Sequence, residues 1–96
     1  MEVRWSARAL ADLEAIQDYL LERSPSAALR MVTVLRGAGE KLSTMAQRGR
    51  PGRWLGTREL IVPNTPYLLP YRVRGEVVEI LRVFHGARRW PPRVDD

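Results

Sequence analysis

The sequence contains no cysteine, a single histidine at position 85 and a single lysine at position 41. The absence of cysteine excludes a disulfide framework and a cysteine-based zinc site, and it fits a reducing compartment. With one histidine, no phosphate loop and no dinucleotide fingerprint, we expect no metal and no cofactor. No apolar run approaches the roughly 18 residues of a membrane span, and MEVRWSAR lacks the apolar segment of a secretion signal. We therefore expect a cytoplasmic protein without a membrane partner.

Acidic residues are scarce in the second half of the chain. Residues 1–45 carry six basic and six acidic side chains, whereas residues 46–96 carry ten basic and five acidic ones. Fifteen of the sixteen basic residues are arginines, and the forked guanidinium binds phosphate or carboxylate through two hydrogen bonds. This half predicts an acidic or phosphate-rich partner. The equally weighted alternative is a solvated surface whose arginines reflect a GC-rich genome.

The first half predicts a strand and a helical hairpin. Residues 2–5 alternate apolar and polar side chains, as a short strand does. Ser6 is a candidate N-cap for a helix of about four turns, in which apolar residues recur at steps of three and four. Ser24-Pro25 ends this helix and begins a second one, which we expect to reach about residue 46. The glycines at 37 and 39 either weaken that helix or allow close approach to another element.

The second half predicts three antiparallel strands over residues 56–62, 67–74 and 77–84, after a basic loop at 47–54. Gly75-Glu76 has the glycine-first pattern of a two-residue type II′ hairpin turn, so paired residue numbers sum to 151 and Arg72 faces Glu79. Pro70 cannot donate a ladder hydrogen bond and is expected at an edge or an irregularity. The predicted fold is one α+β domain over residues 1–96: an N-terminal strand, a helical hairpin and a three-stranded antiparallel sheet.

Two polar residues near the end of the last predicted strand are candidate functional residues. Alternation places Arg82 on the apolar face that carries Tyr71, Val73, Val78, Ile80 and Phe84. An arginine there must reach solvent, find a carboxylate or serve a site. His85 follows where the strand stops. Arg72 has a structural explanation in its pairing with Glu79.

Several stretches that together cover nearly the whole chain resemble the RelE/ParE superfamily of toxins from bacterial type II toxin–antitoxin pairs, with closer similarity to ParE-like members. VRWSARALADLEAIQDYL resembles the opening strand and first helix, and PYLLPYRV and VVEILRVFHGARRWP resemble the C-terminal sheet. The resemblance implies a growth-inhibiting toxin held inactive by a cognate antitoxin. We expect that antitoxin to be acidic and to cover the arginine-rich half. The expected antitoxin-binding side chains on the helices are Leu13, Leu20, Met31 and Leu35.

The superfamily divides by target, and several positions bear on the choice. ParE-like members bind and poison DNA gyrase, whereas RelE-like members cleave messenger RNA on the ribosome by attack of a 2′-hydroxyl. The arginine of many RNA-cleaving members falls here on Leu68, Gly86 stands where some carry a tyrosine, and residues 46–58 contain no acid. These differences favour gyrase. The expected target-binding residues are Arg58, Arg72, Arg82, His85, Arg88, Arg89 and Trp90.

Two alternatives stay open. In a metal-independent endoribonuclease, Arg82, His85 and Arg88 would be the catalytic residues, with His85 as acid or base. In a purely structural reading, the segment after His85 packs the C-terminal tail and Trp90 covers the edge of the core.

Overall fold

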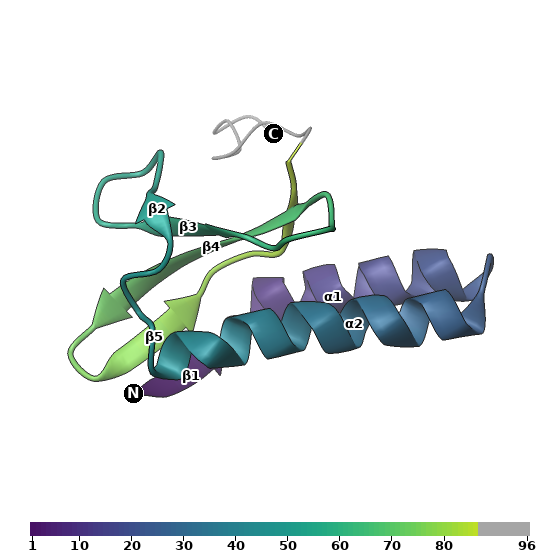
Figure 1. Cartoon of the computed structure of the whole chain (residues 1–96), viewed down its shortest axis with the longest axis horizontal. Coiled ribbons are helices and arrows are strands. Elements are labelled where there is room, and N and C mark those ends of the chain that lie inside the picture. The colour runs from purple at the N-terminus through teal and green to yellow at the C-terminus, as the bar shows by residue number, and fades with distance from the viewer. Residues whose placement is uncertain (87–96) are drawn as a thin grey trace.

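The computed structural model describes residues 1–86. The first half comprises β1 (Glu2–Trp5), α1 (Ala7–Leu21), α2 (Pro25–Glu40) and a short 3-10 helix, η1 (Lys41–Ser43). The second half comprises β2 (Arg50–Pro51), β3 (Arg58–Ile61), β4 (Tyr67–Arg74), β5 (Val77–Ile80) and β6 (Phe84–His85). Figure 1 shows the two helices side by side, reaching past the end of the sheet. None of the helices in the described part is long and apolar enough to cross a membrane.

The sheet has the strand order β1-β5-β4-β3-β2, and β6 pairs with the start of β4. The three predicted antiparallel strands are confirmed as β3, β4 and β5. The β4–β5 register joins Arg72 to Glu79 and Arg74 to Val77, as the sum of 151 predicts. Gly75 has φ +56°, and Glu76 has no positive φ, which fits a type II′ turn. The N-terminal strand joins this sheet as the parallel neighbour of β5.

Both predicted serine caps are present. Ser6 Oγ accepts a hydrogen bond from Ala9 N at 3.0 Å, and Ser24 Oγ accepts one from Ala27 N at 3.3 Å. The second helix ends at Glu40, earlier than the predicted residue 46. Beyond it the chain tightens into a 3-10 turn, which carries Leu42 into the core. This tighter turn was not visible in the periodic spacing, because its side chains continue the helical pattern.

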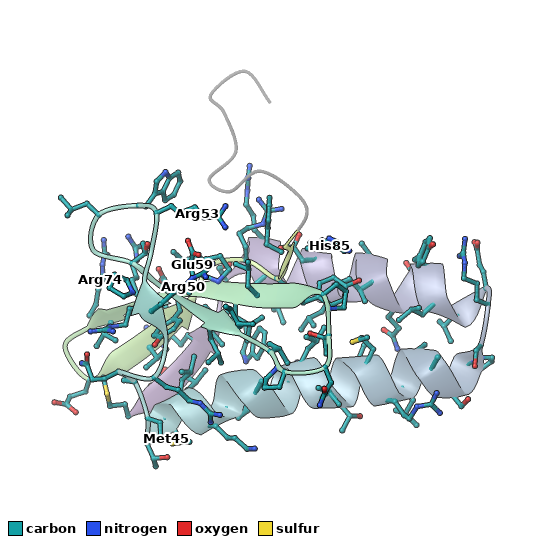
Figure 2. All side chains as sticks on the ribbon, turned by 45° about the horizontal axis from the view of Figure 1, so that its top comes forward. Met45, Arg50, Arg53, Glu59, Arg74 and His85 are labelled. Atoms are coloured by element: carbon teal, nitrogen blue, oxygen red, sulfur yellow. The ribbon has the colours of Figure 1, made fainter. Side chains whose placement is uncertain are left out.

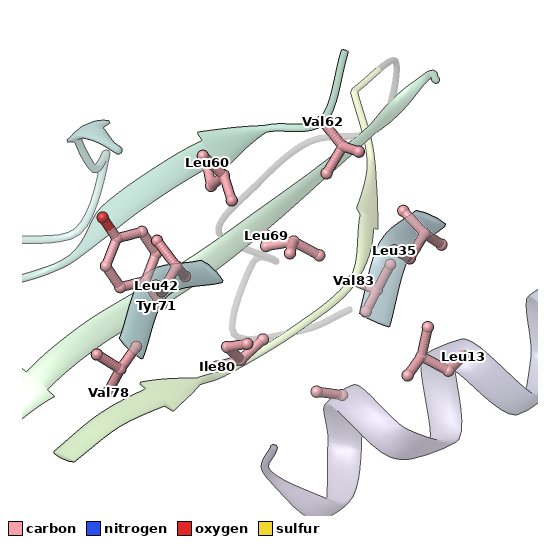
Figure 3. Close-up of a cluster of buried hydrophobic side chains, with 11 residues drawn as sticks. Leu13, Leu35, Leu42, Leu60, Val62, Leu69, Tyr71, Val78, Ile80 and Val83 are labelled. Carbon is pink, nitrogen blue, oxygen red and sulfur yellow. The ribbon is translucent and has the colours of Figure 1, made fainter. Parts of the chain in front are cut away.

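The core lies between the helices and one face of the sheet (Figure 3). The buried side chains come from both helices, from η1, from β3, β4 and β5, and from the segments that follow β3 and β5: Ala9, Leu13, Leu35, Leu42, Leu60, Val62, Leu69, Tyr71, Val78, Ile80 and Val83. Gly39 allows the second helix to approach the sheet, since an added Cβ would lie 2.7 Å from Ile80 Cδ1 and would overlap the Trp5 ring. The predicted close approach at this glycine is therefore confirmed.

The predicted strand over residues 77–84 is interrupted after Ile80, and Pro70 explains why. Leu81 N donates to Pro70 O at 2.8 Å, but proline has no N–H to return to the Leu81 carbonyl. Ser6 Oγ donates to that carbonyl instead, at 2.8 Å. Pro70 thus lies in a central strand, at the irregularity that its missing donor creates.

The interruption corrects the face predicted for Arg82. Val83, not Arg82, joins the core formed by Val78 and Ile80. Phe84 leaves that face and packs with Leu68, its partner in the β4–β6 register. Val73, which we expected on the same apolar face, is 37% exposed near the hairpin end.

Candidate functional site

Arg82 is held by Asp12 of α1, across the junction between helix and sheet. Arg82 Nε donates to Asp12 Oδ2 at 2.8 Å and Nη2 donates to Oδ1 at 3.1 Å. The same carboxylate accepts a hydrogen bond from Val83 N at 2.9 Å. The hydrogen bonds with Asp12 raise the pKa of Arg82, while burial acts in the opposite direction. We expected Arg82 to reach solvent, find a carboxylate or serve a site, and the structure shows a carboxylate partner.

A groove of about 520 Å³ opens next to this ion pair, and we call it the strand-end groove. Its lining residues are Asp12, Ala15, Ile16 and Tyr19 on α1, and Pro66, Tyr67, Val83 and His85 on the sheet side. His85 pairs with Tyr67 in the β4–β6 ladder. The two rings meet edge to face, with centroids 5.6 Å apart. The sequence-predicted histidine therefore lies in a groove that both apolar and polar groups line.

Two other predicted target-binding arginines have structural roles. Arg72 Nε donates to Glu79 Oε1 at 2.7 Å, directly across the β4–β5 pair. Arg58 Nη1 donates to Gly49 O at 2.8 Å and so fixes the loop before β2. Tyr71 Oη reinforces the same loop, because it donates to Ala46 O at 2.7 Å and accepts from Gly49 N at 2.8 Å. These contacts leave target binding by Arg58 and Arg72 a prediction.

The four predicted antitoxin-binding side chains divide into two pairs. Leu13 and Leu35 are 5% and 0% exposed, packed in the core between the helices and the sheet. The prediction for these two is corrected, since apolar side chains already buried in the core offer no surface to a partner. Leu20 and Met31 are half-buried. For them antitoxin binding stays a prediction.

Sequence reasoning missed Glu59, which is 1% exposed. Its carboxylate accepts from Arg50 Nη2 at 3.1 Å and from Arg53 N at 3.0 Å, and Arg53 Nε lies 3.7 Å away. One signal was available: Glu59 is the only acid in residues 41–75, a stretch that holds six arginines. Figure 2 shows Glu59 with Arg50 and Arg53, away from His85.

The predicted residues therefore do not form one cluster. Arg82 and His85 lie by the strand-end groove, whereas Arg72 lies along the β4–β5 hairpin. Arg88, Arg89 and Trp90 lie outside the described residues. Within residues 1–86 no three metal-ligating side chains gather in one place.

Comparison with known proteins agrees with the order of elements and with the sheet. The family model of the ParE toxin of the type II toxin–antitoxin system parDE matches residues 3–90. The chain belongs to this toxin family. It is 44% identical over 90 residues to Toxin RelE2 of Caulobacter vibrioides, covering 91% of this chain and 97% of the relative. Toxin RelE1 of the same organism is 35% identical over 88 residues, covering 88% and 91%.

A solved structure supports the same assignment at the level of the fold. A chain of the chromosomal ParDE TA system from P. aeruginosa has a TM-score of 0.82 and 34% identity, covering 88% of this chain and 95% of that one. The predicted superfamily and the α+β fold are thus confirmed. The toxin–antitoxin context of the family and of this structure supports an antitoxin partner.

Proposed function

We propose that this toxin inhibits growth by binding and poisoning DNA gyrase. The observation that carries the proposal is the packing of Leu68 against Phe84, which are 5% and 7% exposed. Many RNA-cleaving members have an arginine guanidinium at the position of Leu68. In this chain Leu68 and Phe84 form a buried apolar pair there. Stabilising the charge of a cleaved phosphate needs preorganised cations or donors at the reacting group. The engagement of Arg82 by Asp12 removes another cation from that role.

The strand-end groove is the surface that we assign to target binding. Apolar side chains and polar groups both line it, and recognition sites use the polar groups to orient what they bind. In the gyrase-binding proposal, His85 contributes shape and hydrogen bonding at this groove and transfers no proton.

A DNA-cleavage assay tests this proposal. Purified toxin is mixed with gyrase, ATP and supercoiled plasmid, and protein-linked linear DNA is measured after detergent treatment. We expect the linear product to accumulate with the wild-type chain and to fall at least several-fold with His85→Ala. Thr33→Ala, on the exposed surface of α2, is the matched control and should behave like wild type. Protein that arrests growth yet leaves gyrase unaffected would refute the proposal.

Ribosome-dependent cleavage of messenger RNA is the second candidate, because relatives at 44% and 35% identity carry the name RelE. In this alternative Arg82, His85 and Arg88 take the catalytic roles. Cleaved messenger RNA in growth-arrested cells, lost on His85→Ala, would favour it over gyrase poisoning.

We propose further that the antitoxin is acidic and lies along the helices. Large apolar side chains are exposed there: Leu10, Tyr19, Leu21, Leu29 and Val34. Amphipathic partner segments bind such surfaces through their apolar faces. Co-expression with the neighbouring gene should yield a complex that Leu29→Ser weakens and that Ile61→Ser, at an exposed apolar position on β3, leaves intact. A neighbouring gene product that never co-purifies with the wild-type toxin would contradict this assignment.

A further inference from the structure

A loop with internal hydrogen bonds connects β2 to β3. Gly52 N donates to Thr57 O at 2.7 Å, and Thr57 Oγ1 donates to Trp54 O at 2.7 Å. The loop passes so close to itself that a Cβ on Gly52 would lie 2.9 Å from Thr57 C. Gly56 has φ +81°, a conformation that favours glycine. These contacts give the loop one defined shape.

Glu59 fixes the base of this loop and concentrates positive charge there. The buried carboxylate binds the Arg53 N–H and the Arg50 guanidinium, as described above. The two arginine side chains nevertheless stay 50% and 44% exposed. One buried negative charge thus holds two half-exposed positive charges on the flank of the loop (Figure 2).

The tip of the loop is apolar and turned to solvent. Trp54 is 48% exposed and Leu55 is 104% exposed. A second groove, of about 480 Å³, lies between this tip and the β4–β5 hairpin, and we call it the loop groove. It is lined by residues 54–57, residues 72–74 and Leu81.

Arginines also line the opposite wall of the loop groove. Arg72 is oriented by its ion pair with Glu79, at 2.7 Å. Arg74 is exposed and makes no ion pair within residues 1–86. Over residues 46–86 the chain has seven arginines and three glutamates, so this portion carries a net charge of +4. Two of the three glutamates, Glu59 and Glu79, are already bound by arginines.

We propose that the loop groove and its apolar tip bind duplex DNA. The arginines on both sides would contact phosphates, and Leu55 would enter the minor groove between them. Proteins that bind DNA in this way combine arginines with an apolar wedge, because the wedge opens a base step and the cations hold the backbone. An acidic peptide would satisfy the arginines but would not require a fully exposed leucine at the tip of the loop. This surface would place the toxin on the DNA that gyrase handles, yet DNA binding does not depend on gyrase being the target.

Salt-dependent DNA binding tests the proposal without gyrase. The full-length chain is titrated into a fluorescein-labelled duplex, and anisotropy gives the binding constant at several salt concentrations. We expect Arg74→Gln to weaken binding and to reduce the slope of log K against log salt by about one. Leu55→Ser should weaken binding several-fold and leave the slope unchanged. Arg30→Gln, at an exposed position on α2, removes the same charge and should leave both quantities at their wild-type values.

Four results would overturn the inference. They are the absence of duplex binding at low salt, equal losses in Arg74→Gln and Arg30→Gln, tighter binding of single-stranded RNA than of duplex, and loss of antitoxin binding instead of DNA binding in Arg74→Gln and Leu55→Ser. Failure of the gyrase assay with intact DNA binding would reject the proposed target alone. Gyrase poisoning that persists without any DNA binding would reject this surface alone.

Discussion

Removal of the Asp12 carboxylate should destabilise the whole domain. The carboxylate accepts two hydrogen bonds from Arg82 and one from Val83 N, at 2.8, 3.1 and 2.9 Å. Hydrogen bonds to a charged group contribute roughly 1.5–3 kcal/mol each in favourable cases. The Arg82 and Asp12 side chains are 20% and 17% exposed. Partial contact with water, and the sharing of one carboxylate by all three hydrogen bonds, make the total smaller than the sum of three separate contributions. We expect Asp12→Ala to lower the free energy of unfolding by about 2–3 kcal/mol.

A double-mutant cycle isolates the contribution of the ion pair. Asp12→Ala, Arg82→Met and the double variant are unfolded in urea and followed by circular dichroism. We expect a coupling energy of about 1–2 kcal/mol, because the double variant no longer leaves an unpaired charge beside the core. For a domain of this size, Asp12→Ala should lower Tm by about 10–20 °C. Asp18→Ala, at an exposed position on the same helix, should change stability by less than about 0.5 kcal/mol.

The same cycle separates a structural Arg82 from a target-binding one. If Arg82 acts only through Asp12, growth inhibition by Asp12→Ala and by Arg82→Met should fall in proportion to the folded fraction of each variant. A coupling energy below about 0.5 kcal/mol would refute the reasoning on stability. Toxicity lost in Arg82→Met alone, at equal folded fraction, would support a direct role of Arg82 in target binding.

Four further substitutions test the packing, capping and anchoring contacts. Gly39→Ala should destabilise the domain by about 1–3 kcal/mol, because its Cβ would overlap core side chains. Gly37→Ala meets no atom within 4 Å and should stabilise the domain by about 0.5–1 kcal/mol. Thermal melts compare the two variants directly, and equal shifts in Tm would contradict the packing argument. Ser6→Ala should lower the urea midpoint by the equivalent of about 1–2 kcal/mol, since the hydroxyl caps α1 and also donates to Leu81 O. A midpoint equal to that of the wild type would show that neither contact contributes to stability. Glu59→Gln should expose the loop at residues 50–57 to limited proteolysis, and unchanged cleavage kinetics would refute its anchoring role.

Local rules predicted much of this fold. The Gly75-Glu76 turn fixed the β4–β5 register, and Ser6 marked the start of α1. The end of β5 could have been predicted from the same register, because paired residue numbers that sum to 151 also place Pro70 opposite Leu81. Applying the proline rule to that pair would have ended the strand at Ile80.

The remaining features depend on docking between distant segments. Asp12 and Arg82 are 70 residues apart, and no pattern along the chain indicates that α1 lies over that end of the sheet. The parallel pairing of β1 with β5 has the same origin. Glu59 was visible as an isolated acid, but its burial follows from the path of the loop around it. Sequence reasoning therefore selected His85 but missed Asp12, which lines the same groove, and Glu59, which anchors the separate loop after β2.

The position of β1 has a consequence for synthesis of the toxin. Within residues 1–86, β1 pairs only with β5, and Trp5 pairs with Ile80, 75 residues later. At translation rates of roughly 5–20 residues per second, β1 waits about 4–15 s for that partner to be made. Completion of the sheet must follow synthesis of the residues up to His85. The strand-end groove, which Val83 and His85 line, therefore forms late in the synthesis of residues 1–86.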